Sequence, residues 1–414
     1  MTTPMSPTRP ANWMKSRVAN TSDALDRAFA EGLTGHVVTW RDGKRVRVEG
    51  LDREAVEFVS CSYLGLESHP ALVAAAHEAM DRFGVHLSAA RNRMRPPYLL
   101  EFEDLLMQMY RGSPVVVFTS VSNVHLGVLP LLGAGALPSY PVSEAGPAFL
   151  VERTAHSSMQ VLRGVLEQLG PTKRFDLDDP ESLPARLNQA RGRTPIVLVD
   201  GVGSMGGLID VRGLQKTMAE AGGYLYIDDA HGISISGLRG AGYAFEALGD
   251  TLPDNVILAG SLSKAFGGSG STVVVAGPGD VRVITKLANP LVFGHSIMVP
   301  MMAANVAAAR LHLSGEVKAL QERLWANTSA FDELTGGELV NASLRSPVRG
   351  ARFMTEESAF AAAHRLRDAG ILVLPAFYPT VAAGTGLIRF AISALHTTDQ
   401  LAAASAVLDG AHAA

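Results

Sequence analysis

The sequence contains one cysteine, Cys61, among its 414 residues. A single cysteine excludes a disulfide within the chain and is typical of proteins in a reducing compartment, so we expect a cytoplasmic protein. Residues 1–10, which include three prolines, lack the apolar segment and small-residue cleavage site of a secretory signal. We therefore expect no secretion and interpret these ten residues as a loose arm.

Long apolar runs and an excess of basic charge are also lacking. The longest apolar stretches, such as residues 272–275 and 370–374, are far shorter than the roughly 20 residues that cross a bilayer, so no transmembrane helix is predicted. The formal net charge of -4 gives no general attraction to nucleic acids or anionic membranes. Neither is an expected partner, and we predict no bound metal.

The composition that remains is typical of a compact α/β protein, with 47% hydrophobic and 18% charged residues. A chain of this length exceeds one small core, which indicates a large domain and a smaller one. We predict an N-terminal arm and helix at residues 1–55, a large domain at 56–298 and a small C-terminal α+β domain at 299–414.

Apolar, β-branched runs alternate with helical stretches between about residues 55 and 295. Strands that are apolar along their whole length are buried on both faces, and intervening helices favour a mainly parallel sheet between two helix layers. Ligands of such sheets gather at the carboxyl ends of the strands. The predicted strands are 115–118, 149–151, 196–199, 224–227, 256–259 and 272–276.

The two ends of the chain follow other patterns. Apolar residues at helical spacing predict an N-terminal helix over residues 12–32, before strands at 36–40 and 46–50. Beyond Pro300 the sequence predicts one long helix at 301–330, further helices at 356–368 and 397–410, and strands at 371–375 and 387–393.

The most specific motif is GSLSKAFGGSG, residues 260–270, which places Lys264 between hydroxyls and glycines after a buried strand. A lysine whose amine is deprotonated can form an imine with an aldehyde cofactor, while Ser261 and Ser263 can bond a phosphate. Because glycine- and serine-rich loops with a lysine are common, the alternative on this stretch alone is a solvated loop lysine.

A second motif strengthens this interpretation. The strand at 224–227 ends in Asp228 and, three residues later, His231. One parallel crossover unit, about 30 residues or more, separates it from Lys264, so the sheet would bring the two together. A carboxylate that pairs with the pyridine nitrogen of pyridoxal 5'-phosphate (PLP) keeps the ring able to accept electrons. The alternative is that Asp228 caps a helix and His231 is merely packed.

Both motifs resemble those of the α-oxoamine synthase family of fold-type I PLP enzymes. Residues 261–267 (SLSKAFG) are similar to the class-II aminotransferase signature around its lysine, with serine for threonine. Further similar segments follow in the family's order. They are YLGL at 63–66, AHSS at 155–158, DGVGSMGG at 200–207 and the stretch 379–396, which contains Arg389.

The resemblance implies a fold-type I PLP-dependent transferase that works as a homodimer with shared sites. It implies that PLP binds to Lys264, that Asp228 pairs with the ring nitrogen and that His156 stacks on the ring. Ser204 and His231 would bond the phenolic oxygen, and Arg389 the carboxylate of an amino acid. The phosphate would contact Ser261 and the start of the helix at Ser120, Val121, Ser122 and Asn123.

The sequence departs from the family pattern around this pocket. Cys61 stands where the family has an asparagine that helps to hold the substrate. Residues 120–125 (SVSNVH) replace Ser-Gly-Phe-x-x-Asn, so the aromatic residue and the glycine are absent, and the segment 137–146 looks longer than the family's connection. His295 and Ser296 lie in a segment whose hydroxyls, in the family, reach the phosphate of a neighbouring subunit.

The resemblance implies decarboxylative condensation of an amino acid with an acyl-CoA thioester, which forms a carbon–carbon bond at the α-carbon and gives an aminoketone. Lys264 would shuttle the α-proton, and His156 and His231 would support the electron sink and the acyl carbonyl. Coupling of the carbanion to a different electrophile, or transamination, is the alternative. A metabolite sensor without activity is less favoured, because the chain has no DNA-binding extension.

Overall fold

The computed structural model of the protein describes residues 23–378 and 380–412. Its central sheet has the strand order β4-β10-β9-β8-β7-β5-β6. β10 is antiparallel to β4 and β9, and the other pairs are parallel, as the mainly parallel prediction requires. The strands are β4 (Val115–Phe118), β5 (Pro147–Glu152), β6 (Thr172–Phe175), β7 (Thr194–Asp200), β8 (Tyr224–Asp228), β9 (Val256–Ser261) and β10 (Ser271–Val274).

All six predicted strands of this sheet are present, and β6 is the one that the sequence did not predict. β6 lies at the sheet edge and exposes Lys173 and Arg174 between its two buried ends. An edge strand with polar central residues lacks the apolar run that marks a buried strand.

Both faces of the sheet are buried. Along β4, Val115 and Val117 belong to one hydrophobic cluster, while Val116 and Phe118 belong to another. This alternation follows from the two-residue period of a strand. The first cluster includes residues of α3 (Pro97–Met109), α8 (Val211–Glu220), α9 (Tyr243–Ala247) and α12 (Val299–Ser314), and the second includes residues of α4 (Val121–Gly133), α5 (Ser157–Gln160), α6 (Arg163–Leu166), α10 (Pro278–Leu287) and α11 (Asn289–Val292). α7 (Ser182–Gln189) packs beside β6.

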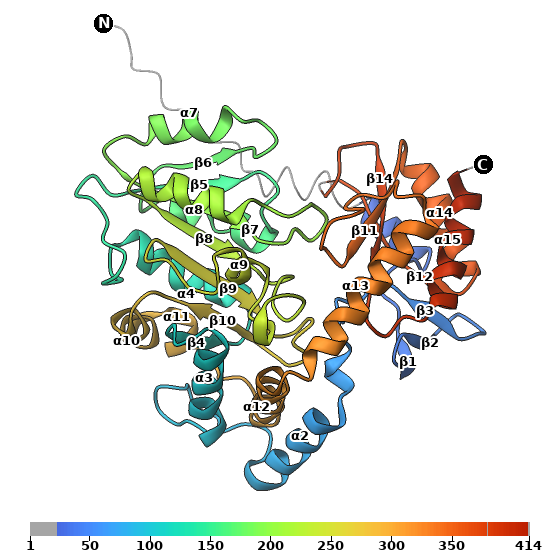
Figure 1. Cartoon of the computed structure of the whole chain (residues 1–414), viewed down its shortest axis with the longest axis horizontal. Coiled ribbons are helices and arrows are strands. Elements are labelled where there is room, and N and C mark those ends of the chain that lie inside the picture. The colour runs from blue at the N-terminus through green and yellow to red at the C-terminus, as the bar shows by residue number, and fades with distance from the viewer. Residues whose placement is uncertain (1–22, 379, 413–414) are drawn as a thin grey trace, which may run out of the picture.

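The two ends of the described chain lie together beside the large sheet (Figure 1). Strand β3 pairs in parallel with β12, which joins N-terminal and C-terminal segments in one sheet of order β1-β2-β3-β12. A second small sheet has the order β11-β14-β13. The strands are β1 (Val38–Asp42), β2 (Arg45–Val48), β3 (Ala55–Glu57), β11 (Val348–Phe353), β12 (Ile371–Leu372), β13 (Leu374–Ala376) and β14 (Gly386–Ala391), and the helices are α14 (Glu356–Asp368) and α15 (Thr398–His412).

The predicted single helix at 301–330 is wrong. The chain forms α12, which packs on α2 (Pro70–Phe83) and α3, and then α13 (Val317–Leu334). Gly315 ends α12 in the left-handed conformation with φ of 88°, a common way for helices to stop. Of the helix predicted at 12–32, residues 12–22 and the arm at 1–10 lie outside the described residues, and 23–30 are helical. The domain boundaries near residues 55 and 298 stay predictions.

The strand directions place polar residues along one edge of the sheet. β4, β7, β8 and β9 run the same way, because β10 is antiparallel to both of its neighbours. Their carboxyl ends carry or precede Ser120, Asp200, Asp228 and Ser261. Four strands therefore deliver their last side chains to a single edge, where ligands of open α/β sheets bind.

We predict that Gly267→Ala lowers the melting temperature more than Gly315→Ala. Both glycines have positive φ, at 79° and 88°, which costs an alanine about 1–2 kcal/mol. A Cβ at position 267 would also collide with the Leu66 side chain and lie 2.7 Å from the Glu67 nitrogen, whereas at position 315 it would meet nothing within 4 Å. Thermal unfolding monitored by circular dichroism measures both, and equal shifts would contradict the predicted close contact.

Candidate functional site

Lys264 lies in a tight loop after β9. Backbone hydrogen bonds close this loop, from Leu262 N–H to Gly270 O (2.9 Å) and from Gly267 N–H to Lys264 O (3.0 Å). Asn305 of α12 accepts the Ser269 N–H at 2.9 Å. Burial lowers the pKa of the Lys264 amine, against the carboxylate of Asp228 and the sulfur of Cys61, which raise it. A fixed lysine with a lowered pKa is ready to lose its proton and act as a nucleophile.

Asp228 is buried at the end of β8, and both of its carboxylate oxygens accept hydrogen bonds. Oδ1 accepts the Ala230 N–H at 3.0 Å, and Oδ2 lies 3.1 Å from Nε2 of His125. Burial alone would raise the pKa of Asp228, but the His125 hydrogen bond and the charges of His125, Lys264 and His156 lower it below its usual value. Asp228 is therefore a carboxylate at neutral pH.

A second carboxyl group lies beside Asp228, because Asp200 is its register partner across β7 and β8. Burial and the charge of Asp228 raise the pKa of Asp200 well above its usual value. Asp200 Oδ1 accepts the backbone N–H of His156 at 3.1 Å. Two adjacent carboxyl groups cannot both ionise cheaply, so the negative charge is favoured on Asp228 and protonation is favoured on Asp200.

His231, Tyr63, Arg389 and Cys61 form a connected polar cluster. His231 Nδ1 lies 2.8 Å from the Tyr63 hydroxyl. Arg389 donates to that hydroxyl at 3.2 Å and to the Cys61 sulfur at 3.1 Å. Burial, with the charges of Lys264 and Arg389, lowers the pKa of His231 well below its usual value, so the imidazole is neutral.

Cys61 differs from an ordinary buried thiol. Burial alone would raise its pKa, but the charges of Arg389 and Lys264 and hydrogen bonds from Tyr63 and Arg389 lower it below the usual value. The Arg389 side chain still has a buried Nε with no hydrogen-bond partner. The guanidinium thus has donor capacity left for a carboxylate.

His156 and Ser204 occupy the loops at the same edge. His156 caps α5 and is exposed, with Nδ1 2.7 Å from the Ser158 hydroxyl. Its charge contributes to the lowered pKa of both Asp228 and His231. Ser204 is half-buried on the turn after β7, which an isolated bridge between Val202 and Leu208 closes.

The hydroxyl groups predicted to bind phosphate lie at the ends of β4 and β9. The Ser261 and Ser263 hydroxyls are 2.9 Å apart. Ser120 caps α4 by accepting the Asn123 N–H at 3.3 Å. Asn123 also bonds Thr119 through its side chain, at 2.7 Å. The first-turn N–H groups without an intrahelical acceptor are thus those of Val121 and Ser122, and they suit an anion.

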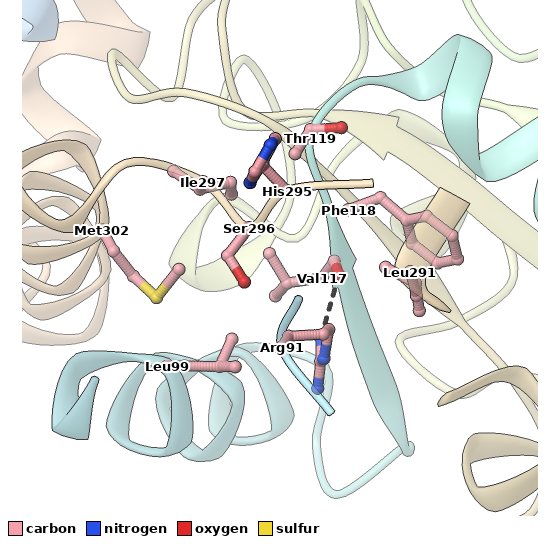
Figure 2. A pocket seen from close by; sticks show the side chains of 10 residues that line it. All are labelled: Arg91, Leu99, Val117, Phe118, Thr119, Leu291, His295, Ser296, Ile297 and Met302. Carbon is pink, nitrogen blue, oxygen red and sulfur yellow. Dashed lines mark hydrogen bonds between the residues drawn. The ribbon is translucent and has the colours of Figure 1, made fainter. Parts of the chain in front are cut away.

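His295 and Ser296 line a cavity beside β4. Arg91, Val117 and Thr119 also line it (Figure 2). Arg91 is buried there and donates to the Val117 carbonyl at 3.0 Å. The structure thus places His295 and Ser296 next to the strand that leads into Ser120. The other predicted residues form a separate group whose members interact electrostatically with one another: Lys264, Asp228, His156, His231, Arg389 and Cys61.

Three residues of the site received no role from the sequence: His125, Tyr63 and Asp200. Asp200 and Tyr63 lie in motifs that the resemblance rests on. Only the fold shows that Asp200 pairs with Asp228 across two strands and that Tyr63 contacts His231. His125 is a buried polar residue in a helix whose other buried residues are apolar or glycine, and that contrast was an available signal.

The residues around Lys264 fit PLP. A lysine with a lowered pKa interacts electrostatically with an ionised, buried carboxylate, as an imine-forming aldehyde on a pyridine ring requires. Ser120, Ser261 and the α4 N-terminus supply donors for a phosphate. Arg389 adds an unpartnered buried Nε for the carboxylate of an amino acid.

Known proteins are similar to this chain over most of its length. The family model "Aminotransferase class I and II" matches residues 53–408. A putative 8-amino-7-oxononanoate synthase of Desulforudis audaxviator (strain MP104C) is 30% identical, over 84% of this chain and 87% of that relative. A 2-amino-3-ketobutyrate coenzyme A ligase of Escherichia coli (strain K12) is 27% identical, over 91% and 92%. The solved Sphingomonas wittichii serine palmitoyltransferase has a TM-score of 0.81 at 21% identity, over 98% of each chain.

We predict that Asp228→Asn and Asp200→Asn behave differently, although the two carboxyl groups are neighbours. Asp228→Asn removes the buried negative charge and should lower activity on the order of a hundredfold or more. Asp200→Asn replaces a protonated acid with an amide that can still accept the His156 N–H, so activity and cofactor absorbance should change little. Steady-state rates and the visible spectrum measure both, and equal losses would contradict the assigned charges.

We also predict that Cys61 reacts with iodoacetamide with a pH midpoint below about 8.5, the ordinary value for a free cysteine. Arg389→Met, which removes the nearby positive charge, should raise that midpoint. Because the chain has one cysteine, the mass increase of the intact protein reports this residue alone. A midpoint at or above the ordinary value in the wild type would refute thiolate stabilisation by Arg389.

Proposed function

Because this chain belongs to the aminotransferase class I and II family, we propose that it condenses an amino acid with an acyl thioester. The reaction joins the α-carbon of the amino acid to the acyl carbon, breaks the thioester and releases CO2 and a thiol, to give an aminoketone. The single observation that carries the proposal is the cluster around Lys264, where the charges of Asp228 and Arg389 both act on the lysine amine.

The matches confirm the predicted resemblance to α-oxoamine synthases, the fold-type I architecture and the PLP dependence. The protein is a PLP-dependent enzyme. Its relatives include a protein named 2-amino-3-ketobutyrate coenzyme A ligase, a name that joins an aminoketone to coenzyme A. That name supports an acyl-CoA as the second substrate of this chain.

When bound, PLP supplies the electron sink that stabilises negative charge at the α-carbon of the amino acid. We assign its aldehyde to Lys264, its ring nitrogen to Asp228 and its ring face to His156. Its phenolic oxygen is assigned to Ser204 and His231. Its phosphate is assigned to Ser261, Ser120 and the α4 N-terminus at Val121, Ser122 and Asn123.

The second half of the site would hold the amino acid. Arg389 binds its carboxylate through the guanidinium, in the charge-assisted geometry that such pairs favour, and Cys61 lies against the same guanidinium. Lys264, whose pKa burial lowers, takes the proton from the α-carbon and returns one after condensation. His231 is neutral and can bond the acyl carbonyl oxygen without repelling Lys264.

We further propose a homodimer in the cytoplasm. Phe293 and Met298, which flank His295 and Ser296, are 78% and 51% exposed, and large exposed apolar side chains are typical of interfaces. A second copy that covers them would bring His295 and Ser296 to the partner's phosphate site. The single cysteine supports a reducing compartment. Among residues 23–378 and 380–412, no helix is both long and apolar enough to span a membrane.

The test is a thiol-release assay with a panel of amino acids and acyl-CoA thioesters. We expect free CoA to appear only when both substrates are present, in a one-to-one ratio with CO2 and with an aminoketone identified by mass spectrometry. Lys264→Ala should abolish all three products, because it removes both the cofactor's attachment point and the α-proton acceptor.

Two outcomes would overturn this proposal. Formation of a 2-oxo acid from the amino acid without thiol release would establish transamination. Exchange of the α-proton with solvent without thiol release from any thioester, coupled to CoA or to an acyl carrier protein, would show that the carbanion attacks another electrophile.

A further inference from the structure

His125 is fully buried on α4 and touches the strand that carries Asp228. Its Nε2 lies 3.1 Å from Asp228 Oδ2, and its Nδ1 lies 2.8 Å from the Tyr226 hydroxyl. Tyr226 and Asp228 are two residues apart on β8, so both point to the same face of the sheet, on which α4 packs. His125 therefore bridges two side chains of one strand from the helix above it.

The direction of one of these hydrogen bonds is fixed. An ionised carboxylate only accepts, so the His125 Nε2 must carry a hydrogen and donate it to Asp228. The Tyr226 hydroxyl stays protonated, because burial raises its pKa well above the usual value. The Tyr226 hydroxyl thus donates to Nδ1 of His125, on the other side of the ring from Nε2. This second hydrogen bond fixes the orientation of the imidazole, with Nε2 toward the Asp228 carboxylate.

The strand register alone does not determine which of Asp228 and Asp200 carries the charge. The two are register partners on adjacent strands at the same sheet edge, and Asp228 is buried whereas Asp200 is half-buried. They also differ in their hydrogen-bond donors. Asp200 accepts one backbone N–H, from His156, whereas Asp228 accepts the Ala230 N–H and the His125 side chain.

We propose that His125 is a positioning residue that keeps the single negative charge of this carboxyl pair on Asp228, where the cofactor's ring nitrogen requires it. The proposal rests on the proposed pairing of Asp228 with that nitrogen. His125 touches no reacting atom and acts through Asp228. It occupies the position at which the resembled family has an asparagine. The histidine side chain is longer, and its two ring nitrogens bond Asp228 and Tyr226 at the same time.

Another buried histidine shows what a purely structural one looks like in this fold. His312 is buried on α12 and bonds the Ala308 carbonyl and the Ser234 hydroxyl, with its ring stacked on Phe266. None of these partners is ionisable in the ordinary pH range. His125 differs because one of its two partners is the carboxylate around which the site is organised.

Titration at Asp228 depends on every charged or titratable group that faces it. These groups are His125 of α4, Tyr226 of the same strand, Asp200 of β7, Lys264 of the β9 loop, His156 of the β5 loop and the neighbouring Asp229. Substitution of His125 alone changes one of them and leaves the other five in place.

The experiment measures PLP binding to the apo-protein and the pH dependence of the bound cofactor's visible spectrum. In His125→Phe, we expect the dissociation constant for PLP to rise on the order of tenfold to a hundredfold, the typical cost of a lost hydrogen bond to a charged group. We also expect a spectral transition to move to higher pH, because burial and the proximity of Asp200 then favour protonation of Asp228.

Three further variants serve as rescue and controls. His125→Gln keeps one N–H donor with a similar reach and should restore both readouts most of the way. Tyr226→Phe should give an intermediate shift, since it frees the far side of the imidazole. His396→Asn replaces a buried histidine that bonds Ser393 and Glu57 in the C-terminal part of the chain, and it should leave both readouts at their wild-type values even if it lowers stability.

The outcomes separate this proposal from the proposed function. Wild-type PLP affinity and spectra in His125→Phe would overturn the role of His125. So would a weaker affinity and a shifted spectrum in the control His396→Asn. Neither result bears on the proposed condensation, which the thiol-release assay tests separately. If His125→Phe does not fold, Tyr226→Phe decides: an intermediate shift of both readouts supports the role of His125, and wild-type values overturn it. If Asp228→Asn binds PLP as tightly as the wild type, the pairing of Asp228 with the ring nitrogen fails, and this proposal fails with it.

Discussion

The buried interaction between the Asp228 carboxylate and the Lys264 amine constrains the rest of the structure. A charge removed from water is costly unless hydrogen bonds and an opposite charge compensate it. The fold supplies this compensation by ending β8 and β9 side by side, so that one strand delivers the carboxylate and the next delivers the lysine loop. α12 then fixes that loop through Asn305, and α4 fixes the carboxylate through His125.

The sequence was sufficient for those parts of the fold that depend on local pattern. Continuous apolar runs marked the six buried strands. The edge strand β6 and the small-domain strand β11 were missed because polar residues interrupt both, and β3 was missed because it has only three residues. An alanine-rich stretch hid the break between α12 and α13, since a helix propensity summed over many residues outweighs one glycine. Gly315 adopts the left-handed conformation at the end of α12, which a glycine reaches without the steric cost that other residues have.

The candidate site divides in the same way. Lys264, Asp228, His231 and Arg389 could be selected because each lies in a motif with a fixed order along the chain. The contacts of His125 and Tyr63 could not be predicted, because they join residues that are 103 and 168 positions apart in sequence, and only strand order and helix packing bring these together. A residue that acts through another residue carries no chemical signature of its own. Its role becomes visible only from the side chain that it contacts.

Two polar systems meet at Lys264, and their charges are opposite in sign. On the proposed cofactor side, ionisation is favoured at Asp228 and protonation at Asp200, which leaves one negative charge. On the proposed substrate side, Arg389 is positive and lowers the pKa of the Cys61 thiol. In the proposed function, the carboxylate of the amino acid must therefore compete with the Cys61 sulfur for the Arg389 guanidinium, whereas a neutral asparagine at position 61 would present no competing charge.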